Sequence, residues 1–179
     1  QVSLMELVEG RKNQKAVLPA SPNGTQIQFG SSEFGSVVEA AEELAEEFLD
    51  FDDAESKTEL LMEFGQSVPD HFEALKKISE AVPGCMSEVY LVARPAPTDA
   101  TRFEFAADSN AGIVRGLIAV LQQLFSGQQV DEVLNYDLEG FFRRIGLHQF
   151  VSTQRRSGLE GMIRRIRTLA ETQASRNDG

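Results

Sequence analysis

The chain has 179 residues, of which 41% are hydrophobic, and its formal net charge is −11 with a single cysteine. This length suits one domain with one core, and a lone cysteine excludes both an internal disulfide and a cysteine cluster for zinc or iron–sulfur ligation. The negative charge argues against a nucleic-acid partner, and no apolar run reaches the roughly 18 residues of a membrane span.

The first segment, residues 1–35, has little periodicity and is rich in Ser, Gly, Pro and Asn around "VLPASPNGTQIQFGSSEFGS". Such a composition is typical of a flexible or loosely docked extension. We expect one folded domain over residues 36–173 and a disordered tail over 174–179.

Apolar residues recur at helical spacing in 36–51, which predicts the first helix of this domain. A second helix follows in 53–69, capped near Asp52 or Asp53 and stopped by Gly65 and Pro69. A short helical piece over 70–82 leads to the cysteine.

Two segments alternate with period two, "SEVYLVA" at 87–93 and "TRFEFAA" at 101–107, and predict strands joined by a hairpin loop. In the first strand Val89, Leu91 and Ala93 share one face, with Tyr90 and Val92 on the other. The period then changes to that of a helix over 110–127, which we expect to be capped by Asp108 or Ser109 and buried almost all round. Helices over 130–136, 137–147 and 152–174 complete an α+β fold, with a small antiparallel sheet packed against several helices.

Charge is distributed unevenly along the chain. Fourteen acidic residues lie between Glu33 and Glu73 against one basic residue, Lys57, whereas eight arginines follow Phe141. The two poles are either solvated faces that pair in part with each other, or surfaces that steer a protein partner.

The only thiol, Cys85, stands in "PGCMSEVY", where an irregular stretch turns into a strand. An unpaired cysteine is often a small buried hydrophobe. The preceding Gly84 instead favours a reactive loop, since glycine opens backbone angles and leaves the thiol approachable. A cysteine hydrolase would need a histidine nearby in space, and only His71 and His148 exist. Because these histidines are far apart in sequence, we expect no metal site.

Five ordered segments carry a family resemblance. They are "LLMEFGQSVP", "GCMSEVYLVAR", "ADSNAGIVRGLIAVL", "LNYDLEGFFRRIGL" and "STQRRSGLEGMIRRIR", which span roughly residues 40–172. In this order they resemble the SufE family, sulfur acceptors that act with cysteine desulfurases in iron–sulfur cluster assembly. The departures from the family pattern are Met86 for Gln, Tyr90 for Trp, Ala107 for Gly and Phe150 for a frequent His.

The resemblance implies a SufE/IscU-like fold and a sulfur carrier, not an enzyme with its own small-molecule turnover. Cys85 would accept persulfide sulfur, stimulate a SufS-type cysteine desulfurase and pass sulfur to an Fe–S scaffold complex of the SufBCD type. Arg155, at the family's arginine position, would favour the thiolate. Gly84, Ser87 and Asp108 would support the loop.

No cofactor is expected on this chain, since the pyridoxal phosphate of such a system belongs to the desulfurase. The family's location implies the cytoplasm, or the plastid stroma after removal of a transit peptide. Two alternatives stay open: a single-cysteine thiol enzyme, such as a peroxidase or hydrolase, and a non-catalytic adaptor of a desulfurase.

Overall fold

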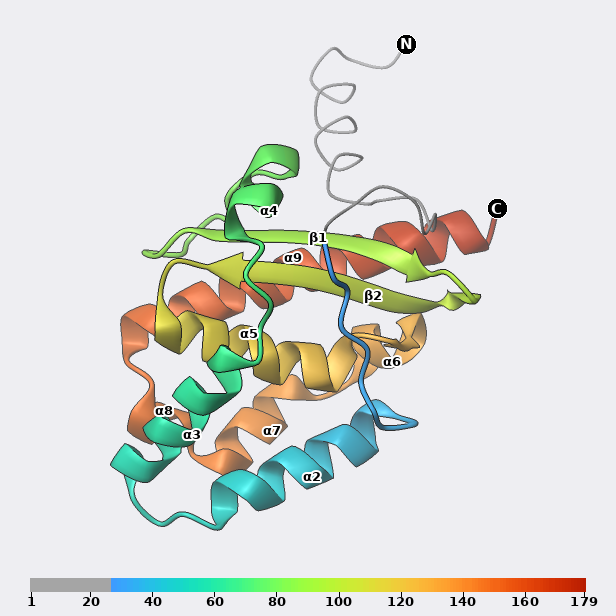
Figure 1. The fold of residues 1–179 in the computed structure, drawn as a ribbon. Helices are drawn as coiled ribbons and strands as arrows, with labels where there is room; N and C mark the ends of the chain where they lie inside the picture. Colours follow the sequence, from blue (N-terminus) through green and yellow to red (C-terminus); the bar gives the residue numbers. More distant parts are fainter. Residues whose placement is uncertain (1–26) are drawn as a thin grey trace.

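A computed structural model describes residues 27–179 as helices on both faces of a small antiparallel sheet (Figure 1). The α+β class predicted from the sequence is confirmed. In chain order the elements are α2 (Val37–Leu49), α3 (Ala54–Gln66), α4 (Phe72–Ile78), β1 (Val89–Ala96), β2 (Asp99–Ser109), α5 (Gly112–Phe125), β3 (Gln128–Gln129), α6 (Val130–Asn135), α7 (Leu138–Ile145), α8 (Leu147–Phe150) and α9 (Thr153–Asn177).

Several helices begin where a side chain accepts a hydrogen bond from the free backbone N–H groups of the first turn, as Asp137 does at α7. Ser36 caps α2, Asp53 caps α3 and Ser152 caps α9. The cap predicted for α5 is wrong. Asp108 and Ser109 end strand β2, and α5 begins after Ala111 without a side-chain cap.

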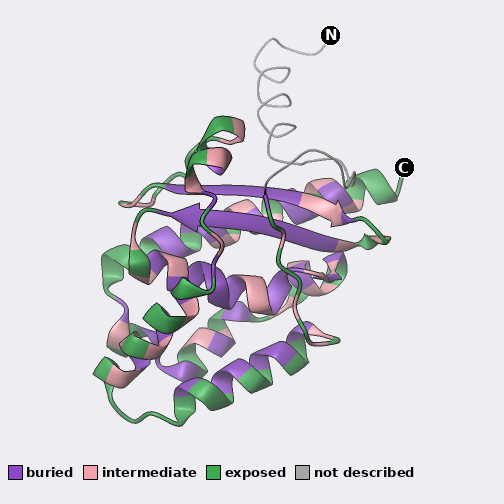
Figure 2. Cartoon of the chain, in the orientation of Figure 1, coloured by how far each residue is buried: buried purple, intermediate pink, exposed green. Residues whose placement is uncertain are grey.

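The sheet has the order β1-β2-β3, with Val89 opposite Ser109 and Ala93 opposite Phe105. Both of its faces are buried, and strands β1 and β2 are drawn as buried over most of their length in Figure 2. Val89, Leu91 and Ala93 belong to the main core, which α5 and α9 also line. The opposite face carries Tyr90 and Val92 in a smaller cluster that includes residues of α4. Strand β3 was not predicted, because two residues show no period.

Helix α5 lies at the centre of the molecule and is buried on most sides, as its sequence predicts. It packs closely against α3 through two glycines. A Cβ atom on Gly65 would lie 2.8 Å from the backbone nitrogen of Gly116, and one on Gly116 would overlap the carbonyl of Leu61. This close contact fixes the position of α5 relative to α3.

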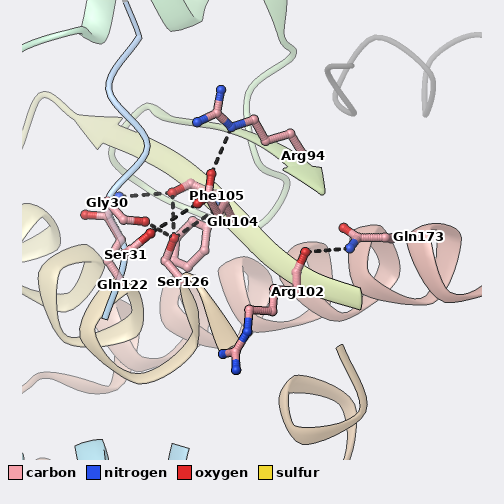
Figure 3. A network of polar contacts seen from close by, with 9 residues as sticks. All are labelled: Gly30, Ser31, Arg94, Arg102, Glu104, Phe105, Gln122, Ser126 and Gln173. Atoms are coloured by element: carbon pink, nitrogen blue, oxygen red, sulfur yellow. Dashed lines mark hydrogen bonds and ion pairs between the residues drawn. The ribbon is translucent and has the colours of Figure 1, made fainter. Parts of the chain in front are cut away.

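Residues 27–35 of the expected extension contact the domain predicted for residues 36–173. Ile27 is buried against the sheet face that carries Tyr90 and Val92. The fully buried Ser126 accepts a hydrogen bond from the N–H of Phe105, at 3.2 Å, and donates one to the carbonyl of Gly30 (Figure 3). Ser31 donates to Glu104, whose carboxylate also pairs with Arg94 at 2.9 Å. This part of the expected extension is therefore docked, and residues 1–26 lie outside the described residues.

The tail predicted over 174–179 begins within helix α9. Helix α9 continues to Asn177, because Gln173 donates to the carbonyls of Ala100 and Arg102 and Asn177 donates to that of Ala100. These bonds attach the end of α9 to the start of β2.

Candidate functional site

The thiol lies in the loop between α4 and β1. Gly84 has a φ of +84°, in the left-handed region that favours glycine, and Cys85 follows it immediately. Strand β1 begins at Val89, so the rigid sheet carries one end of the loop. Cys85 is half-buried, whereas its neighbour Met86 is 79% exposed.

Two glycines of α9 let this loop lie directly on the helix. A Cβ atom on Gly158 would be 3.5 Å from the Sγ of Cys85, and one on Gly161 would be 2.6 Å from the carbonyl oxygen of Pro83. The Cys85 thiol donates to the carbonyl of Gly158, with Sγ and O 3.3 Å apart. Glycine inside a helix costs about 1 kcal/mol relative to alanine, so glycines there often have a packing reason. Two glycines inside a predicted helix were therefore a sequence signal for close packing at Gly158 and Gly161, but neither residue was predicted to belong to the site.

Cys85 faces a cavity of about 260 Å³ between the loop, α5 and α9. The predicted site residues Ser87 and Arg155 contribute to its wall. Its apolar part comes from Val114 and Leu117 of α5 and from Leu159 and Met162 of α9. The cavity therefore offers room beside the sulfur atom, with an apolar floor and a polar entrance.

Burial raises the pKa of the Cys85 thiol, and the charge of Arg164 opposes that rise. The resting thiol is consequently protonated at neutral pH. Arg155, the arginine expected to favour the thiolate, lines the cavity beside the thiol. The arginine whose charge opposes the rise in the pKa of the thiol is Arg164. Its guanidinium would lie 4.0 Å from a Cβ atom on Gly84.

This electrostatic balance predicts slow reaction of the isolated protein with iodoacetamide. The alkylation rate should rise with pH and reach half its maximum above the pH typical of a free thiol, since only the thiolate reacts. In the Arg164→Gln variant the midpoint should move still higher, because the opposing positive charge is gone. Arg155→Gln is the control, and a larger shift in that variant than in Arg164→Gln would contradict the assignment.

Asp108 does not line the cavity. Its carboxylate is 1% exposed, lies 3.0 Å from the Nε of Arg115 and accepts from the backbone N–H of His71 at 3.2 Å. Arg115 belongs to α5, and His71 is the residue at the start of α4. Asp108 thus joins β2 to both helices, and it stands opposite Tyr90 at the start of the strand that follows the cysteine loop.

The histidines lie elsewhere. Within the described residues, those that line the Cys85 cavity include neither of them. His71 is buried with its Nε2 3.3 Å from the carbonyl of Ala107, and His148 is exposed on α8. In residues 27–179 no group of three His, Cys, Asp or Glu side chains is placed to hold a metal ion. A cysteine–histidine pair is therefore missing from the described part of the site.

A search for membrane-spanning segments among the helices of residues 27–179 finds none that combines sufficient length with sufficient hydropathy.

Comparison with known proteins gives a consistent result. The family model SufE, described as an Fe-S metabolism associated domain, matches residues 42–170. An uncharacterized SufE-like protein of Rhizobium meliloti is 36% identical over 132 residues, which cover 73% of this chain and 94% of that protein. One of Rhizobium etli is 33% identical over 135 residues, which cover 75% and 91%.

A solved structure shares the fold. The solution structure of a hypothetical protein from Thermus thermophilus superposes with a TM-score of 0.61 at 21% identity, and covers 76% of this chain and 96% of that one.

Proposed function

Because the chain belongs to the SufE family, whose domain is associated with Fe–S metabolism, we propose that Cys85 accepts sulfur from a cysteine desulfurase and passes it on to iron–sulfur cluster assembly. The observation that carries this proposal is the position of the only thiol. It lies on a glycine-bearing loop, half-buried, at the edge of a cavity of about 260 Å³.

The proposed step is an exchange at sulfur. The Cys85 thiolate attacks the outer sulfur of a persulfide on the donor, a new S–S bond forms, and the donor's S–S bond breaks. The donor leaves as a thiolate and takes up the proton that Cys85 released, so no external oxidant or reductant is needed. Delivery to the next protein repeats the exchange with Cys85 as the leaving group.

The cavity suits this cargo. An added sulfur atom on Cys85 extends the side chain toward the space lined by Val114, Leu117 and Met162. There it would be removed from water and from other thiols. Since the chain has no second cysteine, the carried sulfur has no thiol in the same molecule to react with.

The protonated resting thiol supports a role that depends on a partner. With its pKa raised by burial, Cys85 has a lower thiolate fraction in the isolated protein, which disfavours exchange without a partner. We therefore also propose that the protein stimulates the desulfurase only through direct contact, with the cofactor of the reaction on the partner.

The test is transfer of labelled sulfur. After incubation with a cysteine desulfurase and sulfur-labelled cysteine, the label should map to the peptide that contains Cys85 and should be released by a thiol reductant. The same incubation without the desulfurase is the control and should leave the peptide unlabelled. Absence of label on Cys85, or label elsewhere in the chain, would contradict the proposal.

A further inference from the structure

A second cavity, of about 640 Å³, lies between α7, α8 and α9. We call it the basic groove. It is lined by Leu138, Glu139, Phe142, Arg143, Leu147, His148, Arg156, Leu159, Glu160, Ile163, Arg164 and Arg167.

Positive charge dominates the basic groove. Four arginines face it against two glutamates, and within residues 27–179 none of these arginines forms an ion pair with a carboxylate. Their neighbour Arg144 behaves differently, since it pairs with Glu42 of α2 at 2.6 Å. The basic groove thus keeps an excess of positive charge in a chain whose net charge is −11.

The basic groove also has apolar surface beneath its charges. Phe142 and Ile163 are only half-buried there, beside the buried side chains of Leu138 and Leu147. An apolar floor with a charged rim is typical of a surface that receives a protein segment, because the floor contributes affinity and the rim selects the partner.

The basic groove adjoins the cysteine site. Leu159 lines both cavities, and Arg164 both faces the basic groove and acts on the pKa of Cys85. A protein seated in the basic groove is therefore adjacent to the thiol.

We propose that the basic groove is where the sulfur donor docks, through an acidic surface segment that also carries apolar side chains. This inference rests on the function proposed above and selects between the two charged poles of the chain. Helices α2 and α3 carry eight acidic residues against the single basic residue Lys57 and would repel such a segment, whereas the arginines of the basic groove attract it.

The test compares two charge reversals on exposed arginines, measured with a cysteine desulfurase as the probe. Arg143→Glu changes the basic groove, and Arg176→Glu places the same change at the far end of α9, outside it. At moderate salt, Arg143→Glu should weaken binding to the desulfurase at least about tenfold, while Arg176→Glu should stay within about twofold of the unchanged protein. Arg143→Gln should lie between them, and thermal unfolding of each variant checks the fold.

The outcomes separate this inference from the proposed function. Equal effects of Arg143→Glu and Arg176→Glu, with Cys85 still loaded by the desulfurase, would overturn the docking site and leave the sulfur carrier intact. If the Arg143→Glu protein is loaded with sulfur normally but fails to deliver it, the basic groove binds the sulfur acceptor and the proposed donor docking site is overturned. The docking site is also overturned if the unchanged protein self-associates and Arg143→Glu abolishes that association. If the desulfurase does not load Cys85 in the unchanged protein, the proposed function itself fails.

Discussion

Replacing Cys85 with serine is expected to abolish sulfur acceptance and most of the stimulation of desulfurase turnover. The hydroxyl of serine keeps the size and the polar contact to the carbonyl of Gly158, but it is not a nucleophile toward a persulfide at neutral pH. The mass gain of one sulfur atom, seen in the unchanged protein after incubation with desulfurase and cysteine, should be absent. Sulfide or alanine production by the desulfurase measures the loss of stimulation.

Measuring how the Cys85→Ser protein binds and stimulates the desulfurase distinguishes a sulfur carrier from a non-catalytic adaptor. The Cys85→Ser protein should still bind the desulfurase with nearly unchanged affinity, because the basic groove does not include position 85. Full stimulation of the desulfurase by this variant would mean that the protein acts as a non-catalytic adaptor and that the thiol is incidental. Rapid turnover of peroxide or esters by the isolated unchanged protein would instead favour a thiol enzyme.

Removing the carboxylate of Asp108 is expected to have the largest effect on stability. Asp108→Ala leaves the guanidinium of Arg115, 28% exposed, without its partner at 3.0 Å, and it leaves the buried N–H of His71 without an acceptor. Breaking a largely buried ion pair of this kind costs about 3 kcal/mol in the free energy of unfolding. Denaturant unfolding measures it.

A matched control lies in the same strand. Asp99→Ala removes a carboxylate that is 41% exposed and 3.5 Å from Arg102, so it should cost about 1 kcal/mol or less. A loss in Asp108→Ala no larger than in Asp99→Ala would mean that water reaches Arg115 and His71 once the carboxylate is gone. In that case Asp108 would not be what joins β2 to α4 and α5.

Local patterns account for most of the elements. The period-two segment around Tyr90 and the helical spacing in α2, α5 and α9 were sufficient to predict strands and helices, because burial of one face imposes these periods on the chain. The cap of α5 was predicted wrongly for a related reason. Asp108 has the side chain of an N-cap and stands near the start of the helix, but the carboxylate is used for contacts with residues distant in the chain.

The site was accessible to sequence reasoning only in part. Cys85 and Gly84 were identified from their local context, and Ser87 and Arg155 do line the cavity beside the thiol. Gly158, Gly161 and Arg164 were not identified, since they lie more than seventy residues further along the chain. Their contribution depends on how α9 crosses the cysteine loop.

By itself, the sequence determined that this protein is an α+β domain with one thiol on a glycine-bearing loop, and that its charge is split into two poles. These properties follow from neighbouring residues, whose spacing sets the local structure. The tertiary structure alone decided that α9 packs against the loop that carries Cys85 and that the charge of Arg164 acts on the thiol. It also decided that the arginines of the basic groove lie near the Cys85 cavity. Burial, the electric field at a sulfur atom and the shape of a groove all depend on which distant segments pack together, and a linear pattern does not specify that packing.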